Sequence, residues 1–226
     1  IFDFAGRQSN DDVIKLLAAA GSYEMALGQV IKVNKNSKSI TLTAPAGYAV
    51  SQTGYNSTTK VYAYAVVEAV ASLTKGGVTT YYDSVYNAFG AATKQWGGTP
   101  AAQETITLLK DSTESAINVG SKTNGVNIAF DLNGNTLTLN GSSNTLVNIN
   151  GPSSLTVSNG TVIFNGTGDN PSGFALVDSA LNIAKLTIDV DVVVDANNNC
   201  SAVTVTGGTL ETEGTLSSEH GPAIAT

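Results

Sequence analysis

The sequence IAFDLNGNTLTLNG, residues 128–141, decides the architecture of this chain. It alternates apolar and polar residues, turns at Asn-Gly and alternates again, which is typical of two short strands that meet at a corner. Related stretches begin at residues 155, 181 and 203, so the starts lie 27, 26 and 22 residues apart. Repeats in this range predict stacked coils, each of which covers the apolar face of the next.

The apolar positions of these stretches predict the interior of the solenoid, because alternate side chains of a strand point to opposite faces. Corners are marked by Asn-Gly pairs and by Asn198 and Asn199, since Asn tolerates the left-handed backbone that such corners require. The expected interior residues are Ile128, Phe130, Leu132, Leu137, Leu139, Leu146, Ile149, Leu155, Val157, Val162, Phe164, Leu181, Ile183, Leu186, Ile188, Val203, Val205 and Leu210.

Residues 1–60 differ from the repeats and predict a small α+β attachment or connecting region. Ser9 or Asn10 can cap a helix that Gly21 ends. The segments QVIKV and SITLT, on either side of NKNSK, predict a β-hairpin within residues 29–43. Residues 44–60 are expected to form a turn-rich connection.

Residues 61–100 predict a strand–helix unit that caps the solenoid formed by residues 101–226. Two strands, the second being VTTYY, precede a helix over residues 84–96 that Asp83 can cap. Its apolar face is expected to contain Val85, Phe89, Ala92 and Trp96. We expect this helix to seal the first coil, because an open solenoid end exposes unpaired backbone and an apolar cross-section.

The repeat pattern predicts that the β-helix is incomplete at residue 226. Another repeat is due where the apolar segment PAIAT begins at Pro222, and neither a helix nor a charged edge strand follows. We therefore expect another chain or a downstream domain to cover this end.

Two motifs carry a resemblance to a known family. ITLLKD at residues 106–111 and DLNGNTLTL at residues 131–139, together with the preceding Tyr82-x-Ser84-x-x-x-Ala88 pattern, resemble a module of large bacterial surface proteins and adhesins. In that module these motifs open a pectin-lyase-like right-handed β-helix. The resemblance covers roughly residues 60–226 and implies a mainly β fold, a right-handed parallel β-helix. The family also contains lyases, hydrolases and viral spikes, so it leaves the function open.

Charge argues against several classes of partner. Residues 111–226 carry two basic and eleven acidic residues, whereas residues 1–110 carry nine basic and seven acidic ones. An acidic solenoid offers no electrostatic footprint for nucleic acid or for an anionic membrane surface. No apolar run is long enough to cross a bilayer, so we expect no membrane insertion. The single Cys200 can form neither an internal disulfide nor a metal site with the usual number of ligands.

The acidic residues Asp189, Asp191 and Asp195 are the candidate metal ligands. Asp189 and Asp191 are two apart and are expected to point the same way on one strand, with Asp195 close behind and Asp178 one coil away. Such carboxylates suit a solvated strand face, a tight polar corner, a Ca²⁺ site or the acid and base of glycoside hydrolysis. The sequence favours the solvated face or the polar corner, with no resident cofactor and with calcium as the alternative.

Other catalytic constellations are poorly represented. A lyase needs Arg or Lys beside calcium-binding carboxylates, but the single arginine, Arg7, lies outside the solenoid. His220 follows Ser217, Ser218 and Glu219, and neighbours in sequence rarely converge into a triad, so we expect a surface turn.

Aromatic residues indicate where a sugar would bind. All eight tyrosines and Trp96 fall within residues 1–96. Tyr48 and Tyr55 are candidates for exposure, although a packed ring with a solvated hydroxyl is the commoner arrangement. Any glycan partner is therefore expected at the first half of the chain or between the halves.

We expect a non-enzymatic, extracellular structural or adhesive module of a secreted or surface-exposed bacterial protein. Its expected partner is a glycan or another component of a host or cell surface, with no catalytic and no cofactor-binding residues. The alternative is a virion fibre or tail-spike subunit with a β-helical shaft. A carbohydrate-active β-helix enzyme is the third possibility.

Overall fold

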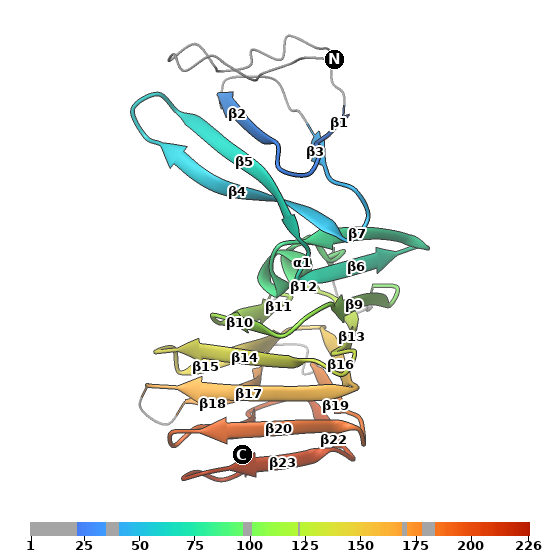
Figure 1. Cartoon of the computed structure of the whole chain (residues 1–226). Coiled ribbons are helices and arrows are strands. Elements are labelled where there is room, and N and C mark those ends of the chain that lie inside the picture. Colours follow the sequence, from blue (N-terminus) through green and yellow to red (C-terminus); the bar gives the residue numbers. More distant parts are fainter. Residues whose placement is uncertain (1–21, 35–40, 97–100, 122, 169–170, 178–183) are drawn as a thin grey trace. The chain divides into compact units, whose positions relative to one another are not determined.

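The structure, a computed structural model, describes residues 22–34, 41–96, 101–121, 123–168, 171–177 and 184–226 (Figure 1). The chain divides into two compact units, Ile1–Ala69 and Val70–Thr226. The sequence suggested a first division at residue 60, whereas the boundary between the compact units follows Ala69. The helix expected after Asn10 lies outside the described residues.

The described residues of the first unit form two small sheets. One is a three-stranded antiparallel sheet in the order β2-β5-β4, and the other is a parallel pair of β1 and β3. Its strands are β1 (Ser22–Glu24), β2 (Val30–Asn34), β3 (Thr41–Thr43), β4 (Tyr48–Asn56) and β5 (Val61–Glu68).

Two predictions for this unit are wrong. The hairpin expected within residues 29–43 does not form, because β2 pairs with β5 while β3 pairs with β1. The stretch predicted as a connection, residues 44–60, contains the nine-residue strand β4. A register shift between Gln52 and Gly54 interrupts the two-residue alternation of β4, which hides the strand from pattern analysis.

The second unit is mainly a parallel β-solenoid of about four turns, which confirms the predicted class of fold. Each coil contributes one strand to each of three sheets, and the column β10-β14-β17-β20-β23 runs from green to red in Figure 1. The strands are β6 (Ala71–Lys75), β7 (Val78–Tyr82), β8 (Gln95–Trp96), β9 (Glu104–Leu108), β10 (Ser112–Glu114), β11 (Ile117–Val119), β12 (Asn124–Gly125), β13 (Asn127–Asp131), β14 (Thr136–Gly141), β15 (Thr145–Asn150), β16 (Ser154–Ser158), β17 (Gly160–Gly166), β18 (Ser172–Val177), β19 (Lys185–Ile188), β20 (Val192–Asn197), β21 (Ser201–Val205), β22 (Thr209–Thr212), β23 (Thr215–Ser218) and β24 (Ile224–Ala225).

The pairing between coils confirms the first predicted repeat spacing, but the later predicted spacings are wrong. Ile128 pairs with Leu155, as their positions in the repeat predict. Leu155 then pairs with Leu186 and Leu186 with Leu210, so the later coils do not start at residues 181 and 203. Val203 instead lies in β21, which is the third strand of its coil. The loops between strands differ in length, so the spacing of the repeats in the sequence varies while interior residues of successive coils remain paired.

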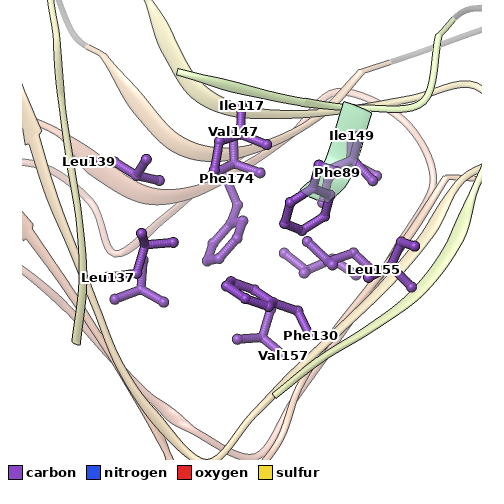
Figure 2. Close-up of a cluster of buried hydrophobic side chains, with 14 of the residues drawn as sticks. Phe89, Ile117, Phe130, Leu137, Leu139, Val147, Ile149, Leu155, Val157 and Phe174 are labelled. Atoms are coloured by element: carbon purple, nitrogen blue, oxygen red, sulfur yellow. The ribbon is translucent and has the colours of Figure 1, made fainter. Parts of the chain in front are cut away.

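The interior is a continuous column of apolar side chains. Nearly all of the expected interior residues are buried, with Val205 and Leu210 partly buried and Leu181 and Ile183 outside the described residues. Figure 2 shows side chains from the surrounding walls and from the capping helix converging on the centre of the cross-section. Phe164 and Phe174 meet edge to face at 5.0 Å. Each buried aromatic or branched side chain contributes about 1.5–3 kcal/mol relative to exposure.

Glycine permits one close approach in this column. Gly173 of β18 has its backbone against the Phe164 ring, and a Cβ atom built there would lie 2.2 Å from that ring and 2.7 Å from the carbonyl oxygen of Ala202. Since real side chains do not tolerate such distances, glycine lets Phe164 fill the interior.

Helix α1 (Val85–Ala91) covers the first coil, as the sequence predicted. Its buried residues Val85, Ala88 and Phe89 form one face, and the Phe89 ring meets the Phe130 ring edge to face at 5.3 Å. Figure 2 shows Phe89 pointing from the helix into the cross-section of the solenoid. Together these contacts bury the apolar end of the column.

The limits of this helix correct the prediction. Ser84, not Asp83, is the N-cap, because its hydroxyl accepts a hydrogen bond from the backbone N–H of Asn87 at 3.1 Å. Asp83 instead accepts from the Asn87 side chain at 2.8 Å. The helix ends at Ala91, and Trp96, expected on its apolar face, belongs to the short strand β8.

Polar side chains of β6, β9 and β10 contact backbone groups at or near both ends of α1. Glu114 Oε1 accepts from the Val85 N–H at 2.7 Å, at the positive end of the helix. Beyond the other end, the buried Glu104 accepts from the Thr93 N–H at 2.9 Å, while the Lys75 ammonium donates to the Ala91 carbonyl and lies 3.9 Å from Glu104. These contacts satisfy backbone groups that a short helix leaves unpaired.

Asparagine side chains connect successive coils on the outside of one corner. Asn165 donates from Nδ2 to Asn140 Oδ1 at 2.8 Å, and Asn197 donates to Asn165 Oδ1 at 2.8 Å. The three residues are register partners at the ends of β14, β17 and β20. This ladder aligns the coils axially through side chains as well as through backbone pairing.

The last coil is less enclosed than the others. Leu210 and Leu216 are partly buried, and 44% of the Ile224 surface is exposed. That another chain or a downstream domain covers this end stays a prediction.

We predict that Phe89→Ala lowers the free energy of unfolding of the solenoid by about 3–5 kcal/mol, because it removes the aromatic ring that covers the interior of the first coil. Tyr86→Ala is the matched control, since Tyr86 lies on the same helix with 54% of its surface exposed. The control should change stability by no more than about 0.5 kcal/mol. Thermal unfolding followed by circular dichroism measures both variants. Equal melting temperatures for both variants would show that α1 does not act as the cap.

Candidate functional site

A row of three tyrosines lies on one face of the β2-β5-β4 sheet. Tyr55 of β4 is directly opposite Tyr62 of β5, and their ring centroids are 4.6 Å apart with planes inclined by 31°. Tyr64 follows two residues after Tyr62 on the same face, with centroids 6.4 Å apart and planes inclined by 25°. Cross-strand aromatic pairs of this kind stabilise a sheet and fix the orientation of the rings.

The rings differ in what they offer to a ligand. Tyr62 has two aromatic neighbours, Tyr55 across the strands and Tyr64 along its own strand. Tyr55 ends the row, and 47% of its surface is exposed. Tyr55 is therefore the ring of this row that is best placed to receive a flat apolar partner.

Sequence analysis identified only part of this site. It named Tyr55 as a candidate for exposure but favoured a packed ring with a solvated hydroxyl, whereas 47% of the Tyr55 surface is exposed. Tyr48, the other candidate, is half-buried and lies opposite Glu68. Tyr62 and Tyr64 were missed as partners, although their two-residue spacing predicts a shared face. Their pairing with Tyr55 depended on recognising β4, which the sequence had not indicated.

The three candidate calcium ligands do not form a cluster. Asp189 and Asp191 lie in the turn between β19 and β20, and not on one strand as predicted, while Asp195 lies within β20. Within the described residues, no three His, Cys, Asp or Glu side chains form a group that could hold a metal ion. Asp178, the fourth acidic residue considered, lies outside the described residues.

The carboxylates of this corner accept hydrogen bonds from the chain itself. Asp191 accepts from the Asn159 N–H at 2.9 Å, and Asp131 accepts from the Asn133 N–H at 2.7 Å. Asn133 and Asn159 have φ of 52° and 58°, so these carboxylates hold the left-handed corners of neighbouring coils. Asp111 accepts in the same way from the Thr136 N–H at 2.8 Å.

Asp195 and the serines near His220 have separate structural partners. Ser217 donates to Asp195 Oδ1 at 2.8 Å, and Ser218 donates to the Cys200 carbonyl at 2.8 Å. His220 Nε2 lies 3.4 Å from Glu219 Oε1, and both side chains are largely exposed. These groups point to different partners and do not form a nucleophilic triad. Arg7, considered for lyase chemistry, lies outside the described residues.

Among the described residues of the second unit, two titratable groups have perturbed pKa values. Burial raises the pKa of the Cys200 thiol to about 11, only partly opposed by a hydrogen bond from the backbone of Gly166. Burial also raises the pKa of the Tyr82 hydroxyl, and the negative charge of Glu104 adds to this effect. Both shifts follow from packing against the core and disfavour the charged forms.

Cys200 is predicted to be unreactive in the folded protein, because the thiolate is the nucleophile and burial suppresses it. The buried, protonated thiol contributes to the free energy of unfolding. This contribution is complete below the ordinary thiol pKa and is lost as the pH rises through about 11, the pKa of the folded state. At neutral pH, a disulfide reagent should modify Cys200 only after unfolding in guanidinium. A cysteine introduced by Ser57→Cys in an exposed turn is the control and should react at once. Equal rates for Cys200 and the introduced cysteine in the native state would contradict this.

Comparison with known proteins does not assign a family. No protein family, no curated protein and no solved structure matched the chain. A separate search of the described residues found no helix that is long and apolar enough to span a membrane.

Proposed function

We propose that the protein is a non-enzymatic, extracellular structural or adhesive module. In this proposal the solenoid is a rigid stem, and the tyrosine row of the first unit is a contact surface. The finer assignment, a right-handed pectin-lyase-like β-helix of a bacterial surface protein, belongs to the same proposal. It is supported by the motifs at residues 106–111 and 131–139, which form the end of β9, the corners after β9 and β13, and the first part of β14.

The use of the carboxylates in the solenoid is the observation that carries this proposal. Asp111, Asp131 and Asp191 accept from backbone N–H groups at corners, and Glu104 and Glu114 accept from backbone N–H groups around α1. A catalytic acid or base must instead face the bond that it attacks in the substrate. Carboxylates held by the fold itself favour a structural role.

The tyrosine row supports an adhesive role in addition. Tyrosine provides a large, rigid contact area with a polar hydroxyl at its rim, and it loses little conformational entropy on binding. Tyr62 limits the motion of Tyr55 in the free protein, which lowers the entropic cost of binding further.

We predict no turnover of polygalacturonate, xylan or starch by the full chain, measured as the release of reducing ends or of unsaturated products. Asp191→Asn is the informative variant, because an amide oxygen can still accept from the Asn159 N–H but cannot act as acid or base. Wild type and variant should be equally inactive and should melt within a few degrees of each other. Turnover by the wild type that Asp191→Asn abolishes would overturn the proposal.

A further inference from the structure

We infer that the β4–β5 hairpin binds the pyranose ring of a neutral glycan, with Tyr55 as the stacking residue. This inference rests on the proposed adhesive function and names the chemistry of its partner.

The Tyr55 ring is held in a fixed position while much of it is exposed. Tyr62 lies against it with a centroid distance of 4.6 Å, and 47% of the Tyr55 surface is exposed. The C–H face of a pyranose is flat and apolar and buries well against such a ring, while the sugar hydroxyls project at its rim. Support from Tyr62 means that little side-chain entropy is lost when the sugar binds.

The surroundings of Tyr55 provide hydrogen-bonding groups for the rim of a sugar. Gln52, Thr53, Asn56 and Ser57 are exposed along the strand and the turn that follows it. Asn56 Oδ1 accepts from the N–H groups of Thr58 and Thr59, both at 3.0 Å. This Asx turn orders the chain after β4. Gln52, the register partner of Tyr64, lies on the face of the tyrosine row and offers a side-chain amide there.

The charge of the hairpin matches an uncharged ligand. Residues 48–59 and 61–67 contain no Asp, Glu, Lys, Arg or His, and Glu68 lies at the far end of β5. Lys60, in the turn, is the one charged residue between Tyr48 and Val67. A glycan rich in uronic or sialic acid would find a single cation there, whereas a neutral glycan loses no favourable charge contact.

A printed array of neutral and acidic glycans, followed by calorimetric titration of the full chain with the best neutral oligosaccharide, tests the inference. Tyr55→Ala should weaken binding about tenfold or more, as expected when a central aromatic contact is removed. Tyr55→Phe keeps the ring and should retain most of the affinity. Tyr86→Ala removes an equally exposed tyrosine from α1 and should have no effect. Gln52→Ala should weaken binding about two- to tenfold and covers the case in which Tyr55→Ala fails to fold.

The outcomes separate this inference from the function on which it rests. Preference for acidic glycans, lack of neutral-glycan binding, or affinity unchanged in both Tyr55→Ala and Gln52→Ala would overturn it. Adhesion of protein-coated beads to a mucin surface provides the second readout. Adhesion that survives both Tyr55→Ala and periodate oxidation of the mucin sugars would overturn the glycan but leave the adhesive function intact. Adhesion that is abolished both by Tyr55→Ala and by periodate oxidation would support it.

Discussion

The axial packing of each coil on the next is the constraint on which the structure depends. Register partners such as Leu137 and Val162 point to the same interior, and their strands are paired by backbone hydrogen bonds. A single coil of three short strands has no partner for its backbone or its apolar face, so it gains both only by stacking. The same requirement explains α1, since Phe89 takes the place of another coil above Phe130. Stability therefore belongs to the column and not to any one repeat.

Several polar side chains of the solenoid form hydrogen bonds within the fold, so they support the stacking of the coils. Asn165 bridges the coils before and after it, and Asp131 fixes the corner of its own coil while accepting from Asn159 of the next. The buried Glu104 is directed to a backbone N–H group beyond the end of α1. The proposed contact surface lies instead in the first unit, where Tyr55 combines a supported ring with an exposed surface.

Short-range pattern was sufficient to predict the solenoid, but it could not place every strand. Alternation and Asn-Gly corners predicted the pairing of Ile128 with Leu155. The predicted starts of the later coils were wrong because the loops between strands differ in length, and alternation of apolar and polar residues does not encode loop length. The pair Asn140-Gly141 was expected to form a turn, yet it ends β14 within the asparagine ladder, since axial pairing overrides local turn preference. The tyrosine face was only half predicted, because pairing of Tyr55 with Tyr62 requires a bulged strand that disrupts its own periodicity.

Native-state hydrogen exchange of the full chain measures whether the coils are stable through axial stacking. Amides of β16, β17 and β18, which form one interior coil, should open with the same free energy. They should also open less readily than those of β22, β23 and β24 in the last coil, whose interior residues are only partly buried. Opening free energies that differ among the three strands of one coil, but agree along each sheet, would contradict stabilisation by axial stacking.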